Sequence, residues 1–109
     1  MSHDSGPVAE SYVPIRDYFG VLSAWWHEAT DYLSSPSEKA DHPAYRAIIE
    51  MDREAVPFIL EELRERGGDW YIALRRILAG EPQLPEPAGT TRQIVAAWID
   101  WGMKHHYLA

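Results

Sequence analysis

Hydrophobic residues recur every three or four positions through most of the chain, the pattern of helices that bury one face. The first such pattern runs from Ile15 to Leu33, and its apolar positions are Ile15, Tyr18, Phe19, Leu22, Trp25, Trp26, Ala29, Tyr32 and Leu33. The Ser-Ser-Pro-Ser run at 34–37 predicts its end, because a residue that precedes proline disfavours the helical region. We therefore expect an amphipathic helix with an aromatic stripe, followed by a polar connection over residues 37–41.

Residues 42–80 stand at the centre of the pattern and predict three short helices whose apolar faces need one another. Pro43 suits the first position of the first helix, where its missing N–H costs nothing. After a break, a second helix is expected over residues 54–66. Gly67 is suited to end it, and Asp69 to cap the third.

The segment 81–89 holds three prolines in nine residues, which predicts a stiff extended crossing. A threonine then caps a last helix within residues 90–108. Residues 1–13 are polar and punctuated by glycine and proline, so we expect a mobile or peripheral arm. No alternating strand pattern appears anywhere in the sequence. We predict an all-α fold of about five helices, with one domain over residues 14–109.

The run from Glu54 to Gly80 resembles a HEAT-type repeat of the short bacterial kind. Such a repeat has an A helix that begins Ala-Val-Pro, leucine-rich positions, a tight turn, and a B helix that ends in a small residue. The matching residues are Ala55, Val56, Pro57, Leu60, Leu63, Ala73, Leu74 and Ile77. Residues 42–51 resemble the B helix of a preceding repeat, so the likeness covers about 39 of the 109 residues.

The sequence departs from the HEAT pattern in two ways. Trp70 is bulky for the start of a B helix, and no third repeat extends a solenoid, which usually needs about three units. The flanking helices are therefore expected to act as caps on a HEAT-like αα-hairpin core within a compact bundle. The stretch from the mid-40s to the C-terminus also resembles a family of small bacterial proteins of uncharacterised function. The resemblance implies a binding scaffold.

Length and composition exclude several classes of protein. A chain of 109 residues supports one core, and no apolar run approaches the roughly 18 residues that span a bilayer. No charged-then-apolar leader opens the chain, so we expect a cytoplasmic protein that does not bind membranes. The absence of cysteine excludes a disulfide framework, a thiol nucleophile and a Cys-zinc site.

The chain is acidic, and the charge is unevenly distributed. The net charge of −7 argues against direct binding of nucleic acid. Residues 1–38 carry six acidic residues and one basic residue, a net charge of −5, which leaves −2 for the rest. This acidic front could dock on a basic partner or could simply be solvated.

Motifs of catalysis or metal binding are weak. His27 and Asp31 have the i,i+4 spacing of metal ligands but lack a third ligand. A carboxylate pair for hydrolysis could come from an acidic cluster, although arginines interleave it. Its members are Glu50, Asp52, Glu54, Glu61, Glu62 and Glu65. There is no Gly-rich phosphate loop or Gly-x-Ser-x-Gly motif. We therefore assign no catalytic, cofactor-binding or metal-binding residue.

Aromatic residues exceed what a small core needs, with five Trp and six Tyr. Trp25, Trp70 and Trp98 are expected as core fillers. Trp25 and Trp26 cannot both face inward, because neighbours on a helix lie about 100° apart. Exposed aromatics are common anchors of interfaces, so we expect such a role for at least one of Trp26, Tyr71 and Trp101.

These observations favour a non-catalytic protein–protein interaction module of the antitoxin, immunity or adaptor type in a bacterial cytoplasm. Its partner would be another protein, such as a basic toxin or nuclease. The residues expected to bind it are Trp26, Tyr71, Arg75, Trp101, Asp17, Glu28 and Asp31. Two alternatives stay open: a small ligand-binding domain or hydrolase that uses the acidic cluster, and a homo-oligomeric structural subunit.

Overall fold

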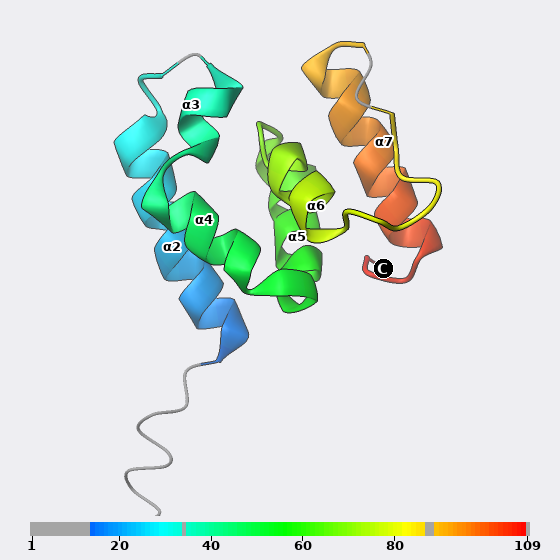
Figure 1. Ribbon diagram of the computed structural model, residues 1–109, viewed down its shortest axis with the longest axis horizontal. Helices are drawn as coiled ribbons and strands as arrows, with labels where there is room; N and C mark the ends of the chain where they lie inside the picture. Colours follow the sequence, from blue (N-terminus) through cyan, green and yellow to red (C-terminus); the bar gives the residue numbers. More distant parts are fainter. Residues whose placement is uncertain (1–13, 34, 87–88, 109) are drawn as a thin grey trace, which may run out of the picture.

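The computed structural model describes residues 14–33, 35–86 and 89–108, and within these residues it contains helices joined by turns and loops, without any strand (Figure 1). The all-α prediction is confirmed. The arm predicted over residues 1–13 lies outside the described residues. The elements are α2 (Ile15–Thr30), α3 (Pro36–Ala40), α4 (Pro43–Glu50), the 3-10 helix η1 (Asp52–Ala55), α5 (Val56–Arg66), α6 (Tyr71–Ile77) and α7 (Thr91–Lys104).

The helices are arranged in three groups that follow the order of the chain (Figure 1). Helices α2, α3 and α4 lie on one side, the pair α5 and α6 is in the middle, and α7 closes the other side. Helix α2 packs on α4, α4 packs on α6, and α7 packs on both α5 and α6. The turn between α5 and α6 gives an αα-hairpin at the predicted place, while its membership of the HEAT class stays a prediction.

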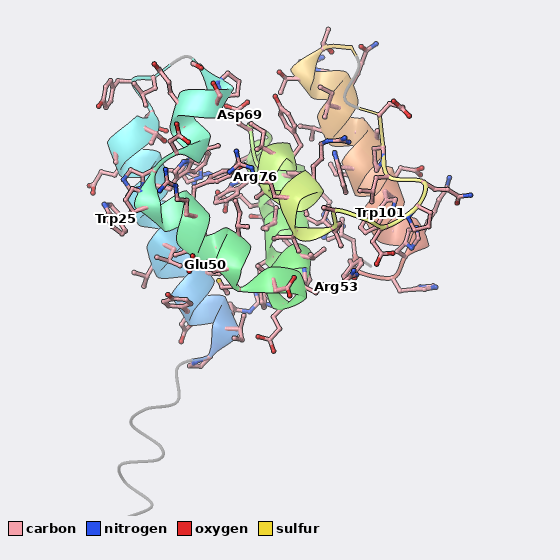
Figure 2. The ribbon with its side chains drawn as sticks, in the orientation of Figure 1. Trp25, Glu50, Arg53, Asp69, Arg76 and Trp101 are labelled. Atoms are coloured by element: carbon pink, nitrogen blue, oxygen red, sulfur yellow. The ribbon has the colours of Figure 1, made fainter. Side chains whose placement is uncertain are left out.

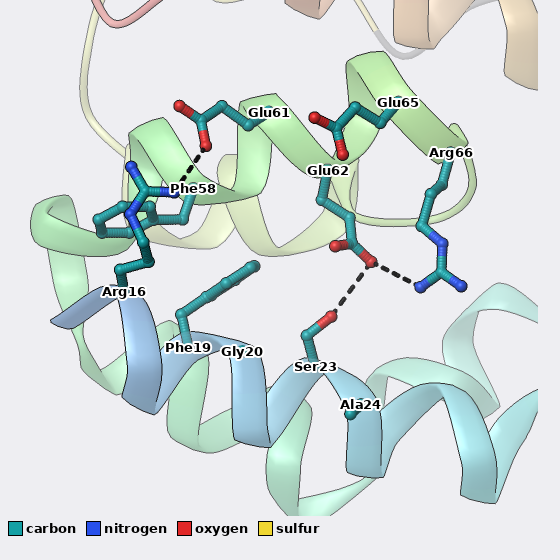
Figure 3. A pocket seen from close by; sticks show the side chains of 10 residues that line it. All are labelled: Arg16, Phe19, Gly20, Ser23, Ala24, Phe58, Glu61, Glu62, Glu65 and Arg66. Carbon is teal, nitrogen blue, oxygen red and sulfur yellow. Dashed lines mark hydrogen bonds and ion pairs between the residues drawn. The ribbon is translucent and has the colours of Figure 1, made fainter. Parts of the chain in front are cut away.

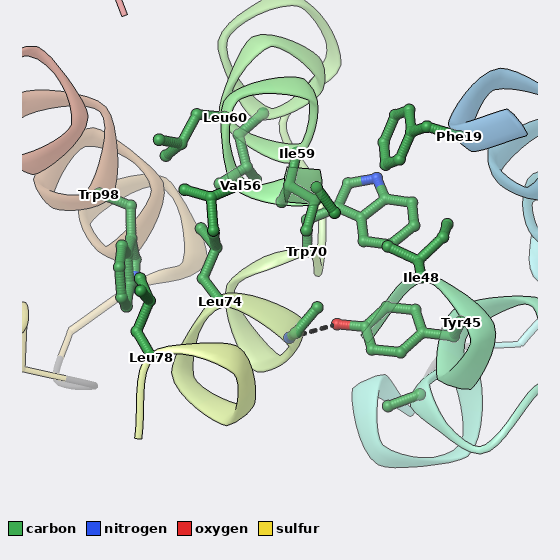
Figure 4. Close-up of a cluster of buried hydrophobic side chains, with 14 of the residues drawn as sticks. Phe19, Tyr45, Ile48, Val56, Ile59, Leu60, Trp70, Leu74, Leu78 and Trp98 are labelled. Atoms are coloured by element: carbon green, nitrogen blue, oxygen red, sulfur yellow. Dashed lines mark hydrogen bonds between the residues drawn. The ribbon is translucent and has the colours of Figure 1, made fainter. Parts of the chain in front are cut away.

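Trp70 lies at the centre of the aromatic half of the core (Figure 4). Its ring stacks on Tyr45 at 4.9 Å with an interplanar angle of 6°. Trp26 approaches it to 4.5 Å and Phe19 to 5.7 Å between ring centroids. Contacts between aromatic rings add to the burial of their large apolar area. One indole, bulky for a HEAT-type helix, therefore joins α2, α4 and α6.

The Tyr45 hydroxyl fixes the start of α6 (Figure 4). It donates to the Asp69 carbonyl at 2.8 Å and accepts the Ala73 N–H at 2.9 Å. Burial raises the pKa of Tyr45, so this hydroxyl stays protonated. The expectation that Asp69 caps α6 is wrong, because its carboxylate instead faces Lys39 Nζ at 3.4 Å.

The predicted polar connection over residues 37–41 is also wrong, because most of it belongs to α3. Pro36 follows the extended residue Ser35 and suits the first turn of α3. The Ser35 side chain accepts the Glu38 N–H and so caps α3. The short helix then supplies a carbonyl, that of Lys39, to the indole N–H of Trp26 at 2.7 Å.

The C-terminal third follows the prediction more closely. Thr90 and Gln93 form a reciprocal capping box at the start of α7. The Pro-rich crossing is tied to the hairpin by Arg75, which donates to the Pro85 carbonyl at 3.0 Å. Helix α7 ends at Lys104, within the predicted segment 90–108, and the Tyr107 N–H turns back to a carbonyl of the helix at 2.8 Å.

Candidate functional site

A groove with a volume of about 310 Å³ lies between α2 and α5 (Figure 3). Gly20 and Ala24 on α2 have little or no side chain, and this leaves the groove open on that side. Helix α5 lines the other side with Glu61, Glu62 and Glu65. The two helices are joined across the groove by side chains, which form one contact group at each end.

Glu62 is the acceptor of the contact group toward the α6 end (Figure 3). Its Oε2 accepts hydrogen bonds from Ser23 Oγ at 3.1 Å, from Trp70 Nε1 at 3.4 Å and from His27 Nε2. Arg66 Nη1, one turn further along α5, lies 3.5 Å away. A single carboxylate therefore connects α2, α5 and the residue that precedes α6.

The environment of Glu62 keeps it ionised. Burial opposes the charge, but hydrogen bonds from His27, Ser23 and Trp70 outweigh burial and lower the pKa of Glu62 below its ordinary value. A general acid for hydrolysis needs the opposite shift, as in a desolvated carboxyl with a raised pKa. Glu62 is therefore a structural acceptor rather than the acid that the hydrolase alternative requires.

The geometry around His27 is not that of a metal or nucleophile site. Its Nε2 faces Glu62, while its Nδ1 lies 3.8 Å from Asp31 Oδ1, so the two carboxylates are on opposite edges of the ring. The Ser23 hydroxyl donates to Glu62 instead of to His27, which is not the arrangement of an activated serine. Within residues 14–33, 35–86 and 89–108, no group of His, Cys, Asp and Glu side chains is placed to hold a metal ion.

Arg16 forms the contact group at the other end of the groove (Figure 3). Its Nη1 lies 3.5 Å from Glu61 Oε1, and its guanidinium carbon is 5.0 Å from the centre of the Phe58 ring. Phe19 packs beside Phe58 with 5.9 Å between ring centroids. At this end of the groove, the Arg16 guanidinium contacts both an aromatic ring, that of Phe58, and a carboxylate, that of Glu61.

The outer side of α2 carries a row of exposed hydrophobic side chains. Trp25 is 48% exposed, and Tyr32, just after the helix, is 82% exposed. Exposed acidic residues flank them on the same helix and its end. We call this surface the α2 face, and it consists of Tyr18, Val21, Trp25 and Tyr32 with Asp17, Glu28 and Asp31.

The structure reverses the expected roles of the two adjacent tryptophans. Trp26, expected at an interface, is 3% exposed and packs on Trp70, whereas Trp25, expected in the core, faces outward (Figure 2). The 100° step between neighbours allows one of them to reach the core, and the position of α4 decides which. Trp70 and Trp98 are fully buried, as predicted.

The remaining predicted binding residues do not form one surface. Trp101 is 8% exposed, so its expected exposure is wrong, and it lies on α7 across the molecule from α2 (Figures 1 and 2). Tyr71 and Arg75, both on α6, are half-buried, and the Arg75 guanidinium holds the Pro-rich crossing. The acidic residues Asp17, Glu28 and Asp31 are exposed on the α2 face, as the sequence indicated.

The apolar pattern of residues 15–33 is wider than one buried stripe, and this width is a signal for the α2 face. With 100° per residue, the apolar positions from 15 to 33, together with Val21, cover an arc of about 160°. A helix that packs on one layer buries a stripe of roughly 100°, so some of these side chains had to stay in solvent. Tyr18, Val21 and Tyr32 lie toward the outer edge of that arc.

Comparison of the chain with protein-family models, with curated proteins and with solved structures finds no match. In the described part of the chain, no helix combines the length and the apolar character that a membrane crossing requires.

Proposed function

We propose that the protein is a non-catalytic binding module that recognises another protein through the α2 face. The observation that carries this proposal is the row of large hydrophobic side chains left in solvent on one helix, bordered by carboxylates. Exposed aromatic side chains that cluster on one surface are typical anchors of interfaces, because binding removes their apolar area from water.

The charge around the anchors favours a basic partner. Asp17, Glu28 and Asp31 border the hydrophobic row, and residues 1–38 as a whole carry a net charge of −5. Complementary charge raises the rate of association and sets the orientation of the partner. A basic toxin or nuclease that is held inactive is one such partner, so an antitoxin, immunity or adaptor role in a bacterial cytoplasm is the function we propose.

The test compares capture of proteins from a lysate of the source organism by three tagged forms of the full chain. The first is the wild type, and the second carries Tyr18→Ala and Trp25→Ala. The third carries Met103→Ala, which removes an equally exposed hydrophobic side chain (47%) from α7. Circular dichroism checks that each variant is folded.

We expect a basic protein to be captured by the wild type and by the Met103→Ala variant and to be lost from the double variant. Capture should also weaken as salt is raised from about 50 to about 300 mM, because this shortens the Debye length from roughly 14 to 6 Å and screens the charges of the interface. If the double variant captures the same protein as the wild type, the α2 face is not the binding surface and the proposal fails.

Self-association is the second use that an exposed hydrophobic row suggests. Two copies that met through the α2 face would also bring their acidic residues together, and like charges at an interface disfavour association. Light scattering at low and high salt separates the two: a dimer that forms only in high salt and disappears with Trp25→Ala would favour the homo-oligomeric subunit.

A further inference from the structure

The groove between α2 and α5 already holds a guanidinium that comes from the chain itself. Arg16 lies over the Phe58 ring and pairs with Glu61, so one side of its cation contacts an aromatic surface and one edge contacts a carboxylate. These are the two contacts by which proteins recognise arginine side chains. The Arg16 side chain is 69% exposed, so this contact is formed at the surface and competes with water.

The groove is larger than the space that the Arg16 contact uses. It continues along α5 past Glu62 to Glu65, whose side chain is exposed. On the α2 side, a Cβ atom added to Gly20 would meet nothing within 4 Å. A second side chain can therefore enter between the helices without moving either of them.

The groove adjoins the α2 face. Gly20 and Ala24 line the groove, and the exposed Val21 and Trp25, each the next residue along the chain, lie 100° further around the same helix. A partner segment that lies across α2 would place one side chain on the hydrophobic row and another in the groove. The groove is lined by three carboxylates and two guanidiniums, so its net charge is negative; these residues are Glu61, Glu62 and Glu65, and Arg16 and Arg66.

We propose that this groove binds an arginine side chain of the partner protein, which replaces Arg16 over Phe58 and against Glu61. This inference rests on the proposed function, because it places the partner's arginine beside the α2 face. Arginine fits better than lysine, since a planar guanidinium stacks on Phe58 and pairs with a carboxylate through two N–H groups at once. Arg16 acts as an internal competitor for the site.

The experiment is an NMR titration of the full chain, labelled with ¹⁵N, with N-acetyl-arginine amide as the probe and N-acetyl-lysine amide at equal ionic strength as its control. We expect the arginine probe to shift the amide signals of Gly20, Phe58, Glu61 and Glu65 and the lysine probe to shift them much less. In Arg16→Gln, the arginine probe should bind about threefold more tightly, the size of effect of one exposed ion pair.

Arg46→Gln is the matched control, because Arg46 is a similarly exposed arginine on α4 that lies 3.9 Å from Asp41. It should leave the affinity unchanged. Gly20→Leu fills the open side of the groove and should abolish the shifts, while circular dichroism verifies its fold. Three results would each overturn the inference: equal amide shifts with both probes, amide shifts at all the exposed acidic residues, or no gain of affinity for the arginine probe in Arg16→Gln.

These outcomes are separate from those of the capture experiment. If Tyr18→Ala with Trp25→Ala loses the partner but the arginine probe does not bind, the groove inference fails and the α2 face stands. If the arginine probe binds as expected but the double variant retains the partner, the proposed α2-face function fails. Loss of the captured partner in Gly20→Leu would support the groove inference.

Discussion

Glu62 is the residue in which the structure concentrates its polar contacts, and its charge should be measurable in the stability of the fold. Its folded pKa is lowered, because hydrogen bonds from His27, Ser23 and Trp70 outweigh burial. A group whose folded pKa lies below its unfolded value, about 4.3 for Glu, stabilises the fold fully above that value. The stabilisation is lost as the pH falls through the folded pKa.

We therefore expect Glu62→Gln to lower the free energy of unfolding at pH 7 by about 1–2 kcal/mol, the difference between hydrogen bonds to a charged and to a neutral acceptor. The difference from the wild type should shrink as the pH falls below about 4. Urea denaturation at pH 7, 5, 4 and 3 measures it. As a control, Glu65→Gln changes an exposed residue on the same helix and should alter the free energy of unfolding little. If Glu62→Gln differed from the wild type by the same free energy at all pH values, the role given to the Glu62 charge would be wrong.

Two helical glycines should respond in opposite ways to the same substitution. Gly20 faces the open groove, so Gly20→Ala should raise the free energy of unfolding by about 0.5–1 kcal/mol, the helix preference of alanine. Gly102 is buried where α7 meets α5, and an added Cβ would lie 2.8 Å from Leu60 Cδ1. Gly102→Ala should destabilise by about 1–3 kcal/mol. Thermal denaturation of both variants checks this, and equal signs would argue against the packing of α7 on α5.

At the scale of elements, the start of α6 depends on a residue of α4. Trp70 is at the N-cap position of α6, but its side chain accepts no hydrogen bond from the first turn. The Tyr45 hydroxyl accepts the Ala73 N–H in its place. Tyr45→Phe keeps the ring on Trp70 but leaves the Ala73 N–H without its acceptor, which should cost about 1–3 kcal/mol. Hydrogen exchange should show faster exchange of the Ala73 amide, and denaturation the loss of stability. Tyr32→Phe, at an exposed tyrosine, should change neither; slow Ala73 exchange in Tyr45→Phe would show that another group caps α6.

At the scale of the whole molecule, exposure of the five tryptophans reports whether the α2 face is free. Trp25 is 48% exposed, and the other four are buried in the core. In acrylamide quenching, Trp25→Phe should remove most of the fluorescence that is quenched readily, with the fold retained. Trp25 is half in solvent and its ring meets that of His42 in a T-shaped contact, at 4.8 Å between ring centroids, so the substitution should cost little stability. Protection of Trp25 in the isolated wild type would mean that copies of the chain cover the α2 face.

Helix class and most helix boundaries were predictable because they depend on nearby residues. The proline of α4, the glycine after α5 and the threonine before α7 act within one turn of their own position, and each stands where the pattern predicted. The acidic side of α2 was predictable for a similar reason: Asp17, Glu28 and Asp31 are charged, and acidic side chains are mostly exposed.

Only the tertiary structure decided which large side chains are buried. Trp25 and Trp26 are adjacent residues of the same type, and both fit the apolar pattern of α2. Which of them is buried follows from where α4 and Trp70 approach α2. The hydrogen bonds of Ser23 and His27 to Glu62, and of Tyr45 to Asp69, join residues that are 24 to 39 positions apart. The groove likewise forms between two helices that are not consecutive in the chain. Sequence determined the local conformation of this chain because helix propensity, caps and breaks are local; packing determined its surfaces because burial depends on the rest of the fold.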